Sequence, residues 1–206
     1  MTDNEFLLFD RLEKIKSVIG KYGEENFYIS FSGGKDSTVL SALIDMALPN
    51  NNIPRVYADT GIELNMIRDF VTNLAKNDDR IDIIKPSVPI RQMLEQDGYP
   101  FKSKVFSQYV KRYRDSGNTK SVLVYTGQHL DKSWSPQNSC PKKLKYLFTD
   151  GYNYFPISDK CCDRMKKKPM KKYSKDKKRP YSIIGVMRSE GGVEQRQNVS
   201  HLAVIS

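Results

Sequence analysis

The strongest constraint on the fold lies at residues 32–37, which read Ser-Gly-Gly-Lys-Asp-Ser. This segment lies between an apolar run, Phe27–Phe31, and a helical pattern over Ser37–Ala47. Glycines allow backbone N–H groups to approach an anion closely, and a helix N-terminus adds unpaired donors and a partial positive charge. Two serine hydroxyls and one lysine charge inside the segment add to them. The order strand, glycine turn, helix therefore predicts a phosphate-binding loop.

Along the rest of the chain, predicted strands alternate with predicted helices. We expect strands at 26–31, 53–58, 81–84, 122–125 and 181–186, and helices at 5–19, 37–48, 63–76, 89–97 and 104–114. Alternation of this kind predicts a mostly parallel sheet with helices on both faces, and such sheets bind ligands beyond the carboxyl ends of their strands. With 206 residues and no linker-like stretch, the chain is expected to form a single Rossmann-like, three-layer α/β/α domain over residues 1–206.

The positive charge is concentrated in one place. The net charge is +10, and residues 164–179 hold ten Lys or Arg against one acid, Asp176, so this stretch alone contributes +9. We call residues 163–180 the basic segment. Such a run could neutralise the phosphates of a ligand bound at the loop, or it could bind nucleic acid or another acidic macromolecule. The alternative is a flexible exposed loop whose lysines mainly give solubility.

Two further features bear on location. No apolar run approaches membrane-spanning length, and the opening residues Met1–Glu5 lack the basic start of a signal peptide. Three cysteines, two of them adjacent, do not make a disulfide framework. We therefore expect a cytoplasmic protein without a membrane partner.

The hexapeptide resembles the pyrophosphate loop (PP-loop) of the adenine nucleotide alpha-hydrolase-like superfamily, which includes N-type ATP pyrophosphatases and the PAPS and APS reductases. Two later segments are similar to the phosphoadenosine phosphosulfate (PAPS) reductase family: Asp59-Thr60-Gly61, and Gly98-Tyr99-Pro100 with Ser103-Lys104. Asp59 and Thr60 could equally cap the next helix, and Lys104 could be a surface lysine at a helix start. The resemblance implies a nucleotide site made of Ser32, Gly33, Gly34, Lys35, Asp36, Ser37, Asp59, Thr60, Gly61 and Lys104.

Two distal segments extend the resemblance to most of the chain. Residues Lys160–Met170 are similar to the Cys-Cys-x-x-Arg-Lys-x-x-Pro-Leu segment of the reductases, and Ile184–Glu190 with Arg196 resembles their later Gly…Arg…Glu…Arg element. In that element arginines hold the anionic end of the nucleotide, which implies this role for Arg188 and Arg196. The planar guanidinium suits it because it binds phosphate or sulfate oxygens bidentately.

The chain departs from the reductases in its cysteines. A complete [4Fe–4S] cluster with four cysteine ligands is not expected, since only Cys140, Cys161 and Cys162 are present and a cluster needs four thiolates. Cys161 and Cys162 are at most an incomplete iron–sulfur motif, and no metal site is expected on one subunit. Cluster-free reductases use a cysteine near the C-terminus, and none follows Cys162 here. The candidate catalytic residues are therefore Lys35, Asp36, Cys161 and Cys162.

Three functions stay open at this point. The first is a PAPS reductase-family protein that binds PAPS or APS and, if it is a reductase, works with a thioredoxin-like reductant. The second is an ATP pyrophosphatase that adenylates tRNA or DNA, with Asp36 helping to place Mg²⁺. The third is a non-catalytic relative that binds a nucleotide or a macromolecule. Whether the chain is an enzyme, and whether it forms a homo-oligomer, is left open.

Overall fold

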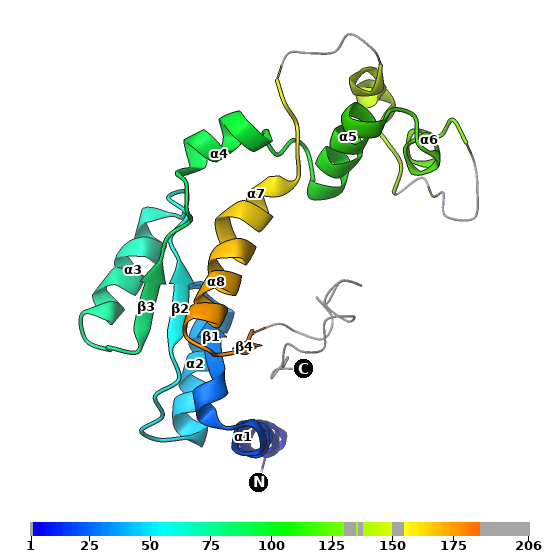
Figure 1. The fold of residues 1–206 in the computed structure, drawn as a ribbon. Coiled ribbons are helices and arrows are strands. Elements are labelled where there is room, and N and C mark those ends of the chain that lie inside the picture. The colour runs from blue at the N-terminus through cyan, green and yellow to red at the C-terminus, as the bar shows by residue number, and fades with distance from the viewer. Residues whose placement is uncertain (1, 130–134, 136–137, 150–154, 186–206) are drawn as a thin grey trace. The chain divides into compact units, whose positions relative to one another are not determined.

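Among the described residues, four short parallel strands form one sheet, in the order β3-β2-β1-β4 (Figure 1). Their bounds are Phe27–Ser30 for β1, Arg55–Ala58 for β2, Ile81–Ile84 for β3 and Tyr181–Ile183 for β4. The computed structural model describes residues 2–129, 135, 138–149 and 155–185. It divides into two compact units, residues 1–87 with 166–206 and residues 88–165.

The sheet belongs to the first unit and has helices on both faces. Strand alternation turns Phe27 and Ile29 of β1 toward one face and Tyr28 toward the other. The first face packs against α1 (Asp3–Tyr22), α2 (Lys35–Ala47) and α3 (Asn65–Ala75). The second face packs against α8 (Lys168–Asp176). The predicted α/β class with a parallel sheet is therefore confirmed.

Local sequence explains where α1 begins. Thr2 accepts a hydrogen bond from the Glu5 N–H at 3.3 Å, and the Glu5 carboxylate accepts one from the Thr2 N–H at 2.7 Å. This capping box satisfies donors that a helix end would otherwise leave unpaired. The predicted helix at 5–19 is confirmed, with two buried residues, Ile15 and Ile19, facing the sheet.

The second unit is mainly helical. Its elements are α4 (Ile90–Asp97), α5 (Lys104–Ser116), α6 (Lys120–Thr126), a 3₁₀ helix (Lys142–Phe148) and α7 (Lys160–Cys162). Its core is rich in aromatic rings, among them Tyr109 and Tyr125, which stack with centroids 4.0 Å apart. An isolated parallel bridge joins Tyr99 to Ile157.

One predicted strand is wrong. Residues 122–125 form part of α6, not a strand. The apolar, β-branched run suited a buried strand, but it lies between Thr119 at the N-cap and Gly127, which has a left-handed φ of 74° at the C-cap. Residue 186, the last of the predicted strand at 181–186, lies outside the described residues, and β4 ends at Ile183.

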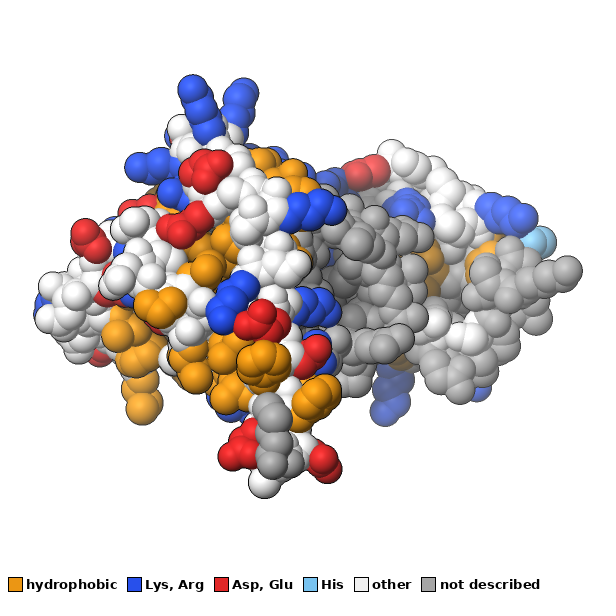
Figure 2. Space-filling view, turned by 90° about the horizontal axis from the view of Figure 1, so that it is seen from below, with side chains coloured by type: hydrophobic (Ala, Val, Ile, Leu, Met, Phe, Trp, Pro, Cys, Tyr) orange, Lys and Arg blue, Asp and Glu red, His pale blue; other side chains and the backbone are white. Residues whose placement is uncertain are grey.

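Apolar side chains are exposed on α1 and α2, the two longest helices of the first unit. Phe6 and Phe9 of α1 are 64% and 56% exposed. In the space-filling view, hydrophobic side chains gather on one part of the surface, and Lys and Arg side chains project from another (Figure 2). Within the described residues, no helix is both long enough and apolar enough to cross a bilayer.

Candidate nucleotide site

The loop 32–37 joins the carboxyl end of β1 to the first turn of α2. Gly34 occupies the N-cap position and has no side chain to cap the helix, while its own N–H donates to the Ser32 hydroxyl at 3.3 Å and its carbonyl accepts from the Ser37 and Thr38 hydroxyls. The first-turn N–H groups are therefore not engaged by a cap, and Lys35 and Asp36 beside them are exposed. An anion bound here would meet backbone donors, the positive end of the helix dipole and the Lys35 ammonium group.

Gly33 cannot be replaced without disturbing this loop. Its φ of +72° is a left-handed conformation that side chains disfavour. A Cβ atom at this position would also lie 2.7 Å from Cγ2 of Val71 and 2.9 Å from Cγ2 of Ile67, both on α3. The loop backbone thus packs directly against α3, which only a glycine permits.

The two serines of the loop have different positions. Ser37 is buried, and its Oγ donates to the Gly34 carbonyl at 3.0 Å and accepts from the Ser32 N–H at 3.2 Å. The Ser32 hydroxyl lies 3.0 Å from the Ser37 hydroxyl and is exposed. Ser37 therefore stabilises the loop conformation, and Ser32 is the hydroxyl that a ligand can reach.

A distant segment also approaches the loop. A Cβ atom on Gly185, just after β4, would lie 3.0 Å from the Asp36 carbonyl oxygen. The chain leaving β4 therefore passes close to the first turn of α2. The sequence placed Gly185 in a motif, but nothing in its spacing indicated this backbone contact. Arg188 and Arg196, the predicted anion ligands of that motif, lie outside the described residues.

The segment Asp59–Glu63 forms a second loop at the carboxyl edge, after β2. The buried Thr60 donates its N–H to Oε2 of Glu63 at 3.0 Å and its hydroxyl to Oε1 at 2.7 Å, while Asp59 accepts from the Gly61 N–H at 3.1 Å. Neither side chain caps α3, whose N-cap is Leu64. The capping alternative is therefore wrong, because both side chains are used inside the loop.

Charge at this edge affects two titratable groups that the sequence did not single out. Burial opposes ionisation of Glu63, but the hydrogen bonds from Thr60 and the nearby charge of Lys166 hold its pKa below the usual value. Burial, with the charges of Glu63 and Asp59, raises the pKa of Tyr57. The Tyr57 hydroxyl is buried and has no hydrogen-bond partner among the described residues. Such an atom is a position where a water or a ligand group could bond.

A pocket of about 420 Å³ adjoins the phosphate loop. It lies between α2 and α3, and its wall is mainly apolar, with exposed Val39, Met66 and Phe70 at 49%, 83% and 40%. The lining residues are Gly33, Lys35, Thr38, Val39, Met66, Ile67 and Phe70. A pocket with this composition, next to a phosphate loop, suits a ligand that joins a flat apolar group to an anion.

Several predicted site residues belong to the second unit. Lys104 is the exposed first residue of α5, and Ser103 before it caps that helix by accepting from the Phe106 N–H at 3.1 Å. Cys161 is half-buried and Cys162 exposed, both in α7. Cys140 is buried, and burial raises the pKa of its thiol. Three cysteines do not fit a four-cysteine cluster.

The basic segment divides by role. It forms a π-helical turn over Asp163–Lys167 and α8. Arg164 donates to Oδ2 of Asp97 at 2.7 Å, and Arg179 donates to the Phe27 carbonyl at 2.7 Å. Both arginines therefore stabilise the fold. The eight lysines between them are exposed: Lys166, Lys167, Lys168, Lys171, Lys172, Lys175, Lys177 and Lys178.

Comparison with known proteins agrees with this geometry. The family model of the phosphoadenosine phosphosulfate reductase domain matches residues 26–158, which include the loop after β1 and the loop after β2. An uncharacterized protein of Methanocaldococcus jannaschii is 30% identical in an alignment of 175 positions that covers 73% of this chain. The chain spans 39% of the length of that relative. The chain belongs to the phosphoadenosine phosphosulfate reductase domain family, within the adenine nucleotide alpha-hydrolase-like superfamily.

Proposed function

We propose that this protein binds an adenosine sulfonucleotide, PAPS or APS, at the carboxyl edge of its sheet. The observation that carries the proposal is the loop 32–37, which presents uncapped N–H groups of α2 beside the exposed side chain of Lys35. Phosphate oxygens would accept hydrogen bonds from these N–H groups and from Ser32. Membership in the family supports an adenosine nucleotide as the source of the phosphates.

The apolar pocket between α2 and α3 is a suitable site for the adenine base of the nucleotide. Val39, Met66 and Phe70 lie beside Gly33 and Lys35, so a base in the pocket would keep its phosphates at the loop. The Asp59–Glu63 loop lies at the same edge, and the second Asp59 carboxylate oxygen could accept a hydrogen bond from a ribose hydroxyl. Thr60 is less suited to this role because its hydroxyl already donates to Glu63.

Sulfonucleotide reduction is the narrower part of the proposal. A reductase step needs a thiolate that attacks the sulfate sulfur, with the nucleotide as leaving group and a thioredoxin-like dithiol to release sulfite. Cys140 is a poor candidate because it is buried and its thiol pKa is raised. Cys162, which is exposed, is the candidate to test first. Sulfite release that Cys162→Ser abolishes would support it, and release that this variant leaves unchanged would exclude Cys162.

Calorimetric titration with PAPS, APS and Mg-ATP tests the binding proposal. We expect the wild type to prefer PAPS or APS, and Lys35→Ala to weaken binding by about tenfold or more, since a charge-assisted phosphate contact is lost. Lys14→Ala is the matched control, because Lys14 is an exposed lysine of α1 in the same unit. A preference for Mg-ATP would favour the pyrophosphatase alternative. Absence of binding to all three ligands would overturn the proposal.

A further inference from the structure

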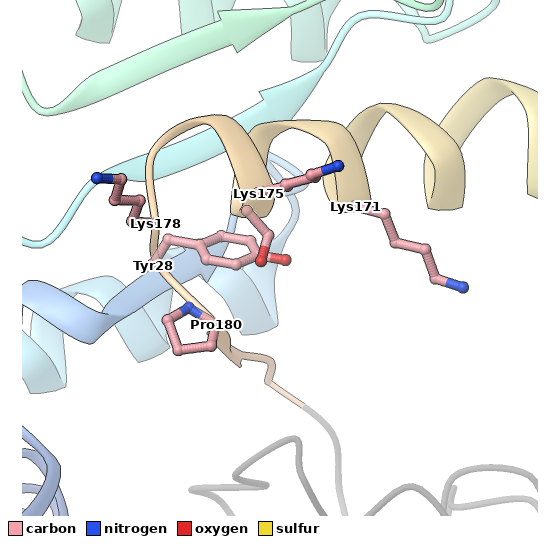
Figure 3. Close-up of a pocket in the computed structure, with 6 residues that line it drawn as sticks. Tyr28, Lys171, Lys175, Lys178 and Pro180 are labelled. Carbon is pink, nitrogen blue, oxygen red and sulfur yellow. The ribbon is translucent and has the colours of Figure 1, made fainter.

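Three lysines of the basic segment line a second pocket, away from the phosphate loop. This pocket of about 420 Å³ lies between α8, the turn after it and β1. Its lining residues are Tyr28, Lys171, Ser174, Lys175, Lys178 and Pro180 (Figure 3). Because Pro180 directly precedes β4 and Tyr28 is the second residue of β1, the pocket lies toward the amino ends of the parallel strands. The phosphate loop follows the carboxyl end of β1.

The chemistry of this pocket selects anions. Lys171 and Lys175 extend from α8 and Lys178 from the turn after it, with the Lys171 side chain pointing away from the Tyr28 ring, and no carboxylate is among the described residues that line the pocket (Figure 3). The Ser174 hydroxyl already donates to the Arg179 carbonyl at 2.8 Å. The charged groups that remain are ammonium groups, which only donate hydrogen bonds.

The positive row extends beyond the pocket. From Lys166 to Lys175 the exposed lysines span roughly 14 Å at the helical rise per residue. At the roughly 3.4 Å axial spacing of phosphates along one strand, this length matches about four successive phosphates. Lys166 lies near Glu63, because its charge acts on that carboxylate, so the row begins at the carboxyl edge of the sheet. It ends at the Tyr28 pocket near the amino edge.

The row also works against the stability of α8. Lys167 and Lys171, like Lys171 and Lys175, are like charges four residues apart, which repel on a helix. An acidic partner would relieve this repulsion, whereas solubility requires no such alignment on one helix.

The turn after α8 gives a second, independent indication. Lys178 has a φ of +55°, a left-handed conformation that glycine commonly adopts after a helix. The turn is held by the hydrogen bonds from the Arg179 N–H to the Ser174 carbonyl at 2.9 Å and from the Lys178 N–H to the Lys175 carbonyl at 3.2 Å. A lysine at a position that favours glycine costs stability but adds an ammonium group to the pocket.

We propose that α8 and the turn after it form a nucleic-acid-binding surface, with backbone phosphates along the lysine row and one phosphate in the Tyr28 pocket. Tyr28 is 5% exposed and Tyr173 is 7% exposed, so neither ring can stack on a base. Binding therefore depends on the phosphate backbone and not on sequence. This surface is separate from the nucleotide site, and its test does not rest on the function proposed above.

Fluorescence anisotropy with a short labelled duplex, titrated at several salt concentrations, tests the proposal. In the triple variant Lys171→Gln, Lys175→Gln, Lys178→Gln we expect binding to weaken by about tenfold or more. We also expect the slope of log K against log salt to fall by about 2 to 3, at about 0.9 per lost phosphate contact. The control triple Lys14→Gln, Lys76→Gln, Lys85→Gln removes the same charge from exposed positions of the same unit. It should change the affinity by less than about threefold.

The single substitution Lys178→Gly distinguishes a loss of duplex binding from a loss of folding stability. Lys178→Gly should hold or raise the urea midpoint of unfolding, because it removes the left-handed lysine, and should still weaken duplex binding. Lys35→Ala should leave duplex binding unchanged while it weakens nucleotide binding. Equal losses in both triple variants would overturn the proposal, as would a wild type that does not bind the duplex. Binding to polyglutamate of equal charge as tight as to the duplex would also overturn it.

Discussion

Thr60 is bonded twice to the carboxylate of Glu63, through its N–H to Oε2 at 3.0 Å and through its hydroxyl to Oε1 at 2.7 Å. Glu63→Ala would leave the buried Thr60 donors without a partner, so we expect a loss of about 1 to 3 kcal/mol in the free energy of unfolding. Nucleotide affinity should fall with it, because the loop after β2 loses its shape. Urea unfolding and calorimetry would measure the two effects.

The pH dependence of Glu63 gives a separate check on the same contact. Its pKa is lower in the folded state, so its contribution to stability is present above the unfolded pKa of about 4.3 and is lost as the pH falls through the folded pKa. Glu63→Ala should therefore reduce the acid sensitivity of unfolding. If the free energy of unfolding of Glu63→Ala fell as steeply at acid pH as that of the wild type, the assignment would be contradicted.

Gly33 tests the packing of the phosphate loop. We expect Gly33→Ala to lower the free energy of unfolding by about 2 kcal/mol or more, because the left-handed φ and the contacts with Val71 and Ile67 both oppose a Cβ atom. Gly20→Ala is the control, since Gly20 lies within α1 and a Cβ atom there meets nothing within 4 Å. It should stabilise the protein by about 0.5 to 1 kcal/mol through helix propensity. Similar effects of both variants would argue against the loop geometry.

At the amino edge of the sheet, the Asp45 carboxylate balances the charge of the buried Arg55 guanidinium. Arg55 is 1% exposed and donates to Oδ1 of Asp45 at 2.5 Å, and Arg80 donates to the same oxygen at 2.8 Å. Asp45→Asn would leave Arg55 without its charge partner. Because Asp45 itself is partly exposed, we expect a loss of about 1 to 3 kcal/mol in the free energy of unfolding. Asp10→Asn, at an exposed carboxylate 3.7 Å from the Arg11 guanidinium, should cost less than about 1 kcal/mol.

The same residue predicts a pH effect. Burial opposes ionisation of Asp45, but hydrogen bonds from Arg80 and Asn51 and the charge of Arg55 hold its pKa below the usual value. The stability it contributes is therefore present above about pH 4 and is lost as the pH falls through the folded pKa. Unfolding curves of Asp45→Asn should converge with those of the wild type at low pH, and a constant difference would refute the charge argument.

Tyr125 predicts loss of stability at alkaline pH in the second unit. Burial raises the pKa of Tyr125 to about 12, so its stabilising effect is complete below the unfolded pKa of about 10 and is lost as the pH rises toward the folded value. Tyr125→Phe keeps the ring that stacks on Tyr109 and removes the ionisable group. Unfolding of this variant should therefore depend less on pH, by about 1 kcal/mol per pH unit above pH 10.

Thiol labelling of the native protein should distinguish the cysteines. We expect Cys162, which is exposed, to react with a thiol reagent before Cys140, which is buried with a raised pKa. Mass spectrometry of peptides from the labelled protein would assign the sites. Reaction of Cys140 first would contradict its burial, and denaturant should make all three thiols equally reactive.

Short-range chemistry in the sequence determined much of the first unit. The apolar run before residue 32, the glycines and the helical pattern after them predict β1, the loop and α2, because each depends on neighbours in the chain. The predicted strand at 81–84 matches β3. The same kind of reasoning failed at 122–125, since a short apolar run fits a buried strand and a buried helix equally well.

Only the tertiary structure decided how the basic segment divides. In the sequence, Arg164 and Arg179 count equally with the lysines between them, because composition cannot show which charges have partners. The fold brings Asp97 to Arg164 and the Phe27 carbonyl to Arg179, across 67 and 152 residues of chain. It also seats Tyr173 against Tyr28, with ring centroids 5.7 Å apart, which orients α8 and leaves its lysines exposed. Charge and loop chemistry are local properties of the chain, whereas partners and exposure depend on contacts between distant residues.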